Sequence, residues 1–207
     1  MSASLSPTPF NQRRRLLVIQ FLSVFALVAL LLSRPAWRED RPFHEFIEMT
    51  GLALVLMCVF GRLWSILYVG NRKNAVLVTS GPYSITRNPL YLFSTIGATG
   101  IGLMFGSVVV ATTMGLLSYL VFRATAAKEA VYLRNKFANQ YRSYAARTPL
   151  FWPDFRLYQD IGETSFSPDA LKKTFLDALY FLALFPVIEG LEYIQTVGYL
   201  PTVLWLY

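Results

Sequence analysis

The sequence predicts an all-α integral membrane protein with about five transmembrane helices, two of which form a tight helical hairpin. Apolar residues make up 55% of the 207-residue chain, and the mean hydropathy of +0.43 exceeds that of ordinary soluble domains. Only 15% of the residues are charged, but the net charge is +7. In a membrane protein this excess indicates basic cytoplasmic loops that contact anionic lipid headgroups, so nucleic acid is not the expected partner.

Two apolar runs in the first third of the chain predict single spans. Residues 16–33 are about long enough to cross a bilayer core, and residues 47–70 are comfortably so. Residues 1–12 lack a signal-peptide cleavage site, so the first run is expected to remain as a membrane anchor.

Residues 90–122 form an apolar run that is too long for one crossing, and they predict the hairpin. Small residues along this run allow two helix backbones to approach closely. They are Gly97, Gly100, Gly102, Gly106 and Gly115. The turn is expected near Phe105-Gly106-Ser107.

The last apolar run, residues 175–207, predicts one further span. Its helix has a clear start, because Ser167 suits the N-cap, Pro168 the first helical position and Asp169 the first turn. Pro186 is expected to break this span, and a short tail follows Gly198.

Charge alternation along the connections orients the spans. Residues 13–15 are three arginines before the first span, residues 34–46 carry no net charge, and residues 71–89 and 123–156 are basic. The positive-inside rule then places the N-terminus and the basic connections in the cytoplasm. The expected location is the inner membrane of a bacterium.

Metal chemistry is not expected from this composition. Cys58 is the only cysteine and His44 the only histidine. A thiolate cluster or an imidazole site therefore lacks ligands.

The most informative segment is residues 77–91, LVTSGPYSITRNPLY, a polar stretch between two apolar runs. Its Gly-Pro and Asn-Pro pairs are turn signals, and each proline bars its predecessor from the helical region. The segment therefore predicts irregular backbone with free amides and carbonyls. Its rings and its cation suit a flat small molecule with both positive and negative parts. These groups are Tyr83, Arg87 and Tyr91.

Residues 127–144 form a second polar segment, which has a helical period. An amphipathic helix lying on the cytoplasmic leaflet explains the period, but it does not explain Glu129, one acid among many bases. Residues 148–153, TPLFWP, then end the helix with two prolines. The apolar stripe consists of Ala130, Leu133, Phe137, Tyr141 and Tyr144.

Together the two segments resemble the isoprenylcysteine carboxyl methyltransferase family, which is related to the membrane phospholipid N-methyltransferases. The resemblance rests on Gly-Pro-Tyr, on Arg-Asn-Pro-Leu-Tyr, and on Glu129 followed by Leu133 and the paired tyrosines. It implies a membrane enzyme that takes a methyl group from S-adenosylmethionine in a cytoplasmic cofactor pocket. Residues 1–76 are then N-terminal anchor helices, residues 77–153 the methyltransferase core, and residues 154–207 a C-terminal linker and membrane helix.

The chain departs from this family pattern at three places. The isoprenylcysteine enzymes commonly have histidine at the position of Asn88, whereas asparagine occurs in the phospholipid branch, so an isoprenylcysteine substrate is less favoured. The acidic pair is reduced to Glu129 followed by Ala130. The usual Phe-Gly turn is Phe137-Ala138, which is expected to be tolerated in a helix.

The resemblance and the chemistry of the donor together assign roles. Arg87 is suited to bind the donor carboxylate in a bidentate contact, and Glu129 to bind its ammonium or a ribose hydroxyl. These two are the expected catalytic residues. Tyr83 or Tyr91 is expected to face the sulfonium or the adenine. The expected cofactor-binding residues are Gly81, Pro82, Tyr83, Arg87, Asn88, Pro89, Tyr91 and Glu129.

Structural roles are alternatives for the charged side chains. Arg87 is also able to pair with lipid phosphate as a positive-inside anchor, and Glu129 to form a salt bridge with Arg123 or Lys128. Arg62, inside the second span, either faces an interior polar site or snorkels to the interface.

The expected methyl acceptor is a membrane lipid or a lipid-linked molecule, because most of the surface of so small a protein lies in the bilayer. Tyr141, Tyr144 and Trp152 are the expected acceptor-binding residues, since amphipathic rings suit the headgroup depth. A carboxylate or thiol acceptor needs no base, whereas an amine needs a proton acceptor, so a pre-ionised acceptor is favoured. A non-enzymatic membrane scaffold or transporter subunit explains the helices and basic loops, but not the two motif-bearing segments.

Overall fold

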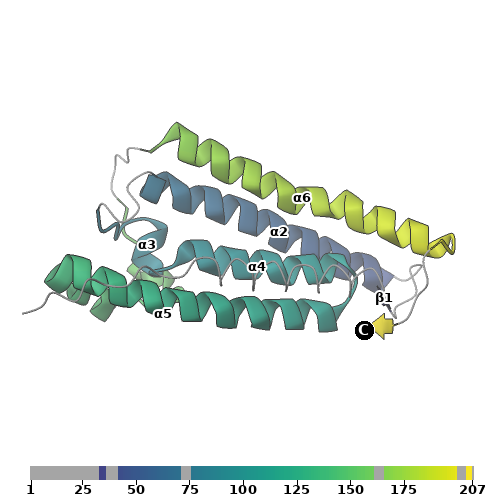
Figure 1. The fold of residues 1–207 in the computed structure, drawn as a ribbon, viewed down its shortest axis with the longest axis horizontal. Coiled ribbons are helices and arrows are strands. Elements are labelled where there is room, and N and C mark those ends of the chain that lie inside the picture. The colour runs from purple at the N-terminus through teal and green to yellow at the C-terminus, as the bar shows by residue number, and fades with distance from the viewer. Residues whose placement is uncertain (1–32, 36–41, 71–75, 161–165, 200–203, 207) are drawn as a thin grey trace, which may run out of the picture.

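The computed structural model describes residues 33–35, 42–70, 76–160, 166–199 and 204–206. Within these residues, long helices lie side by side in one bundle (Figure 1). They are α2 (Pro42–Val69), α4 (Pro89–Met104), α5 (Val108–Arg147) and α6 (Pro168–Thr196). The connections contain the one-turn helix α3 (Pro82–Ile85) and the 3-10 turn η2 (Phe155–Leu157), and the short strands β1 (Ser33–Pro35) and β2 (Leu204–Leu206) pair in parallel.

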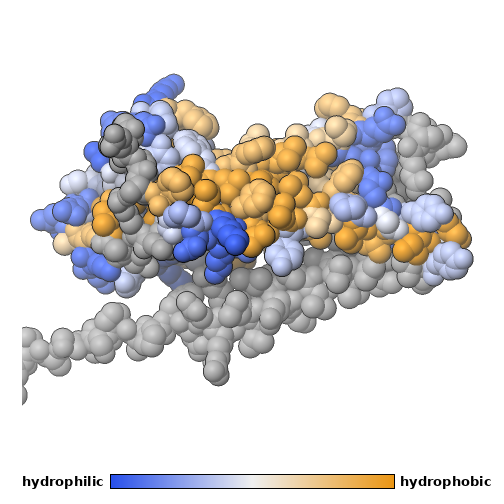
Figure 2. All heavy atoms as spheres, turned by 90° about the horizontal axis from the view of Figure 1, so that it is seen from above, coloured by the Kyte–Doolittle hydropathy of each residue, from blue (hydrophilic) through white to orange (hydrophobic). Residues whose placement is uncertain are grey.

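Three of the described helices, α2, α5 and α6, are long and apolar enough to cross a membrane. Helix α4 has 16 residues, about 24 Å at 1.5 Å per residue, slightly less than a bilayer core of about 30 Å. The face seen in Figure 2 carries a band of apolar side chains between two more hydrophilic ends. The predicted all-α membrane fold is confirmed, while residues 16–32 of the first predicted span lie outside the described residues.

The predicted hairpin is also confirmed. Helix α4 ends at Met104 and α5 begins at Val108, so the turn falls on Phe105-Gly106-Ser107. The side chain of Ser107 accepts a hydrogen bond from the Val110 N–H and caps α5, which satisfies one of the free amides at the helix start.

Glycines bring the backbones of α2 and α4 into contact. A Cβ atom on Gly100 would lie 2.7 Å from the carbonyl oxygen of Gly51, so only glycine fits this crossing. Beside it, an apolar cluster joins α2, α4 and α6. Its buried members are Val55, Ile101, Met104, Phe105 and Ile188. This core lies towards the hairpin turn, at the end of α4 opposite to Pro89.

Helix α6 begins as predicted but is not broken. Ser167 caps it by accepting the Ala170 N–H, and Pro168 stands at the first helical position. The prediction of a break at Pro186 is wrong, because α6 continues through Pro186 to Thr196. One proline removes one backbone hydrogen bond, which membrane-helix bundles tolerate because neighbouring groups satisfy the freed carbonyl.

Helix α5 extends from the hairpin turn through the second polar segment and changes direction at Ala138. This residue has φ 43° and ψ −115°, a conformation that a side chain with a Cβ atom rarely adopts. The expectation that the Phe137-Ala138 pair is tolerated in a helix is therefore wrong, since the helix stops and restarts there. The turn directs the short segment 139–147 so that Tyr141 and Tyr144 are buried.

Candidate functional site

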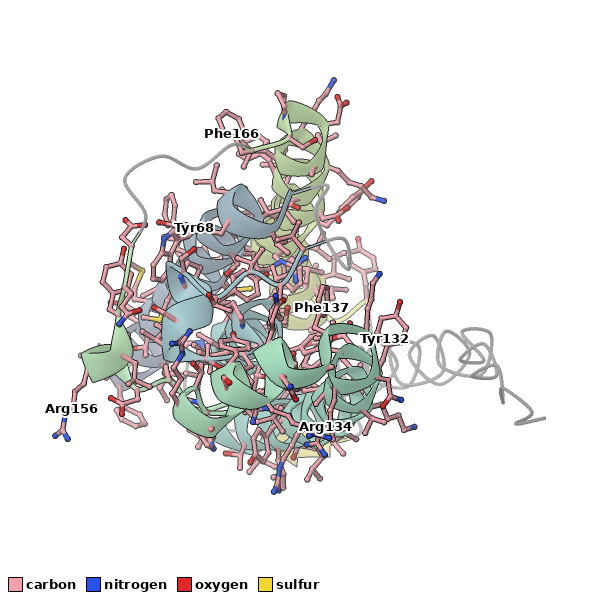
Figure 3. The ribbon with its side chains drawn as sticks, turned by 90° about the vertical axis from the view of Figure 1, so that its left-hand side faces the viewer. Tyr68, Tyr132, Arg134, Phe137, Arg156 and Phe166 are labelled. Carbon is pink, nitrogen blue, oxygen red and sulfur yellow. The ribbon has the colours of Figure 1, made fainter. Side chains whose placement is uncertain are left out.

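A pocket lies at the end of the bundle where α4 begins, and Figure 3 views the molecule from this end. The space inside the pocket, counted together with the solvent at its open mouth, is about 670 Å³. It is lined by Val69, Val76, Leu77, Val78, Tyr83, Arg87, Asn88, Pro89, Leu90, Tyr91, Glu129, Leu133 and Tyr144. Arg87 and Glu129, from the two segments singled out in the sequence, thus line one pocket.

The loop that contributes Arg87 is shaped by Gly81 and by two prolines. Gly81 has φ 57°, in the left-handed region that glycine adopts freely, and a Cβ atom there would meet the ring of Tyr68. Pro82 and Pro89 occupy the first turns of α3 and α4, where the missing N–H is not needed. The segment is therefore two helix starts joined by an irregular stretch, as predicted.

The segment after α5 covers this loop and fixes its backbone. The Arg87 N–H donates to the Pro149 carbonyl at 2.9 Å, and the Asp154 N–H donates to the Ile85 carbonyl at 2.9 Å. Further bonds run from Asn88 Nδ2 to the Leu150 carbonyl (2.8 Å), from Thr86 Oγ1 to the Phe151 carbonyl (2.8 Å) and from the Gly81 N–H to the Gln159 carbonyl (2.7 Å). These bonds satisfy most of the polar groups between Gly81 and Asn88, so the loop is a fixed platform. The prediction that its backbone amides and carbonyls are left free for a ligand is therefore wrong for most of them.

Arg87 is oriented by Tyr141. Its Nη1 donates a hydrogen bond of 3.2 Å to the Tyr141 hydroxyl, and its guanidinium carbon lies 6.0 Å from the centre of that ring, within the range of cation–π attraction. The Nε of Arg87 is buried and has no hydrogen-bond partner among the described residues. A buried donor without a partner is costly, so a ligand that accepts this N–H would be favoured.

Tyr83 is fixed by Tyr144, whose hydroxyl donates a hydrogen bond of 2.6 Å to the Tyr83 carbonyl. Both side chains are buried. Burial raises the pKa of the Tyr83 hydroxyl, and the neighbouring Tyr144 and Glu129 shift it in the same direction. Tyr83 is therefore a neutral phenol at physiological pH, which offers a ring and a hydroxyl to a ligand but no negative charge.

Tyr91 and Glu129 complete the polar part of the pocket. The ring of Tyr91 stacks on Phe122 of α5, with ring centres 5.2 Å apart and planes inclined by 11°. Glu129 follows on α5 and lines the pocket with Leu133. A cation, an acid, aromatic rings and an apolar wall are thus combined in one site, which suits a ligand that is zwitterionic at one end and flat at the other.

A sequence model of the phospholipid methyltransferase family matches residues 47–140. The matched region runs from α2 through the pocket loop and past Ala138, and it contains both Arg87 and Glu129. The chain belongs to the phospholipid methyltransferase family.

Two related proteins align with nearly the whole chain. The cobalt-zinc-cadmium resistance protein CzcN of Cupriavidus metallidurans is 33% identical over 197 residues, which cover 95% of this chain and 90% of that protein. The nickel-cobalt-cadmium resistance protein NccN of Alcaligenes xylosoxydans xylosoxydans is 30% identical over 200 residues, which cover 95% of this chain and 93% of that protein. No solved structure matches the chain.

In this phospholipid methyltransferase family member, the predicted cofactor residues divide into two groups. Those that line the pocket are Tyr83, Arg87, Asn88, Pro89, Tyr91 and Glu129. Gly81 and Pro82 are buried in the turn before α3 and are absent from the lining, so they shape the loop.

The three residues predicted to bind the acceptor lie at different places. Tyr144 lines the pocket. Tyr141 is only 2% exposed and contacts Arg87. Trp152 is exposed and stacks on Tyr119 of α5, with ring centres 5.4 Å apart, and it lines a neighbouring pocket that also contains Arg87.

The segment after Pro153, which was predicted to be a linker, also helps to hold the pocket loop, because the Gln159 carbonyl accepts the Gly81 N–H. The Tyr68 hydroxyl donates a 2.6 Å hydrogen bond to Asp160 Oδ1, and the Tyr158 hydroxyl donates one of 3.2 Å to Asp160 Oδ2. Tyr68 and Asp160 are 92 residues apart, and no local pattern links them. Leu133 forms part of the apolar wall of the pocket. The sequence did indicate this residue, because it belongs to the predicted apolar stripe of residues 127–144.

Arg62 and His44 lie outside the pocket lining. Arg62 Nη1 donates a 2.6 Å hydrogen bond to Ser94 Oγ, which ties α2 to α4 and corresponds to the interior alternative. His44 stands in the first turn of α2, at the other end of that helix from Val69, with its Nε2 2.9 Å from Glu48 Oε1. Among the described residues, no group of three or more His, Cys, Asp or Glu side chains is placed to hold a metal ion.

Proposed function

We propose that this protein is an S-adenosylmethionine-dependent methyltransferase that acts on a lipid or lipid-linked acceptor in the bacterial inner membrane. The observation that carries the proposal is that Arg87 and Glu129 line one pocket with the rings of Tyr83 and Tyr91. This set of groups complements the donor's carboxylate, ammonium, sulfonium and adenine. Membership of a methyltransferase family supports the same reaction class.

Within the pocket, each donor group has a partner among the chain's own side chains. Arg87 binds the carboxylate, for which its buried Nε–H is available. Glu129 accepts from the ammonium or from a ribose hydroxyl. Tyr83 or Tyr91 faces the sulfonium or the adenine, and Leu133 supplies apolar surface to the flat end of the donor.

The donor supplies an activated methyl group, to which the acceptor's lone pair bonds while the carbon–sulfur electron pair stays on sulfur. The protein's contribution is to orient the two partners and to keep water out. A carboxylate or thiolate acceptor has no proton to lose. An amine acceptor must lose one, and Glu129 is the single carboxylate among the described residues that line this pocket.

The acceptor reaches the site from the bilayer. Helix α5 exposes large apolar side chains on its membrane-spanning half, including Leu116, Leu117 and Leu120, so lipid chains surround this part of the protein. Tyr144 and Trp152 then border the path at headgroup depth, where amphipathic rings are favoured. Tyr141 serves the acceptor indirectly, through the position of Arg87.

The pocket and the N-terminus face the cytoplasm. The half of α5 that leads to the pocket exposes basic side chains, as the positive-inside rule requires of a cytoplasmic segment. They are Arg123, Lys128, Arg134, Lys136, Arg142 and Arg147. In this arrangement residues 77–153 form the methyltransferase core, residues 1–76 its anchor, and residues 154–207 a linker and membrane helix, the first part of which covers the loop as far as Asp160.

A binding and transfer experiment tests this function. The purified protein in detergent is titrated with S-adenosylmethionine by calorimetry, and membranes that contain it are then incubated with methyl-labelled donor and extracted for lipid. We expect saturable donor binding and label in a lipid fraction, both absent for the Arg87→Ala protein. Donor binding without any labelled lipid would move the acceptor out of the bilayer, and no donor binding would reject the enzyme.

A non-enzymatic scaffold or transporter subunit is the second candidate, and the relatives named for resistance to cobalt, zinc, cadmium and nickel favour it. The two candidates differ in what Arg87→Ala does to metal tolerance in cells that depend on this protein. If methyl transfer underlies resistance, tolerance falls together with activity. A scaffold keeps full tolerance when the donor site is disabled but the protein still inserts.

A further inference from the structure

A second pocket adjoins the proposed donor pocket, and among the residues that the structure describes Arg87 alone lines both. The space inside it, counted together with the solvent at its wide mouth, is about 630 Å³. Its other walls are the last turn of α5, residues 145–147, and the segment from Thr148 to Leu157. A ligand there would lie next to one in the donor pocket, with the Arg87 side chain between them.

The charged groups of this second pocket are two guanidiniums and one carboxylate, from Arg87, Arg147 and Asp154. The carboxylate is already engaged, because Asp154 Oδ1 accepts the Arg156 N–H at 3.1 Å and caps η2. The C-terminal end of α5 adds a partial negative charge of about half a unit. One of the carbonyls at this end, that of Tyr144, already accepts a hydrogen bond from the Thr148 N–H. When no donor is bound to Arg87, the two full positive charges outweigh these negative ones, so the pocket favours an anion.

Trp152 gives the same pocket an apolar surface. Its side chain is 62% exposed, although the ring is held against Tyr119, with ring centres 5.4 Å apart and planes inclined by 29°, and against Phe151 at 5.7 Å. A fixed and exposed indole beside two guanidiniums suits a ligand that carries both an anionic group and an apolar part.

We propose that this second pocket is the acceptor subsite, and that Arg87 and Arg147 bind a carboxylate or phosphate group of the methyl acceptor while Trp152 contacts its apolar part. The inference rests on the proposed methyltransferase function, because that function makes the neighbouring pocket the donor site. It narrows the acceptor to an anion-bearing molecule. Arg87 then contacts both the donor and the acceptor, which holds the two ligands close together in a fixed orientation.

The test measures anion binding without the donor. The intrinsic tryptophan fluorescence of the purified protein in phosphate-free detergent is followed while inorganic phosphate, or phosphatidic acid in mixed micelles, is added. We expect a saturable change that is lost in Trp152→Phe, with tighter binding of phosphatidic acid if the natural source is a lipid. Arg147→Gln should weaken binding about tenfold, the cost of one charge-assisted contact, and should leave S-adenosylmethionine affinity within about twofold.

The matched control is Arg156→Gln, because the Arg156 side chain points away from the body of the molecule (Figure 3) and is absent from the pocket lining. It should bind either probe as the wild type does. An equal loss of anion affinity in Arg147→Gln and Arg156→Gln would mean that the anion is attracted by the general positive charge of this surface. A loss of S-adenosylmethionine affinity in Arg147→Gln would assign the second pocket to the donor. Either result overturns the proposal, as does the absence of a saturable response to both probes. Failure of the proposed function is seen separately, as no donor binding by the wild type.

Discussion

The hydroxyl of Tyr141 accepts a 3.2 Å hydrogen bond from the guanidinium of Arg87, which lies 54 residues earlier in the chain. Tyr141 belongs to the short segment that follows the break at Ala138. A helix that continued straight through Ala138 would carry Tyr141 in another direction. The orientation of the Arg87 guanidinium therefore depends on the backbone conformation of Ala138, three residues before Tyr141.

The Tyr141→Phe substitution tests this contact, because it removes the hydroxyl and keeps the ring. We expect the affinity for S-adenosylmethionine to fall about fivefold, since one such hydrogen bond contributes about 1 kcal/mol. Calorimetric titration in detergent measures it. Tyr132→Phe, which alters an exposed tyrosine on α5, is the control and should bind normally. Wild-type affinity in Tyr141→Phe would remove Tyr141 from the donor site.

Removal of either charged group in the donor pocket should abolish methyl transfer. Arg87→Ala and Glu129→Ala each leave a donor charge without its partner, which typically costs about 2–5 kcal/mol. Calorimetry should show much weaker donor binding, while expression and detergent extraction stay normal. Arg134→Ala, at an exposed position on α5, provides a control of similar charge change. Unchanged donor affinity in both pocket variants would contradict the assignment.

The elements that were predicted correctly are those with local causes. The hairpin turn follows from an apolar run that exceeds one bilayer thickness and contains Gly106, and the start of α6 follows from the Ser167 cap. The irregular backbone around Arg87 was predictable because two prolines interrupt the helix there. The prediction that this loop lies close to Glu129 was based on the family resemblance, since spacing in the sequence alone does not show that two distant segments come together.

The features that were missed have tertiary causes. Pro186 does not break α6, because the bundle around it supports a helix that lacks one hydrogen bond. The contact of Asp160 was not predicted, because its partner Tyr68 is 92 residues away in the sequence, on α2. Ala138 was expected to remain helical on the basis of propensity, but the burial of Tyr141 and Tyr144 requires a turn there, and this burial outweighs propensity.

The strain at Ala138 predicts that glycine stabilises the protein. With φ 43° and ψ −115°, an alanine there costs about 1 kcal/mol or more, which a residue without a Cβ atom avoids. We expect Ala138→Gly to raise the melting temperature by about 2–4 °C, measured by thermal unfolding in detergent. Ala127→Gly, at an exposed helical position of α5, should lower it. A fall for both variants would mean that Ala138 is not strained.

The contact between α2 and α4 predicts that Gly100→Ala destabilises the bundle. The added Cβ atom would lie 2.7 Å from the Gly51 carbonyl oxygen and 2.9 Å from the Leu54 Cβ, and such overpacking typically costs about 1–3 kcal/mol. The melting temperature should fall by at least about 3 °C. Gly190→Ala on α6 is the matched control, because nothing lies within 4 Å of its added Cβ atom. Equal behaviour of the two variants would argue against close backbone packing.

The basic half of α5 predicts that the donor pocket opens to the cytoplasm. Asn139 is exposed at the pocket end of the bundle. Helix α6 also starts at this end, because its cap Ser167 lies beside Gly70, the residue after α2. Tyr199 follows the last turn of α6 and is therefore at the opposite end. In a Cys58→Ala background, a membrane-impermeant maleimide should label Asn139→Cys only in inverted vesicles and Tyr199→Cys only in right-side-out vesicles. Cys58 is buried, and its replacement removes the remaining thiol. Labelling of Asn139→Cys from outside alone would place the pocket away from the cytoplasm, where the donor is made, and the proposed methyl transfer would then lack its substrate.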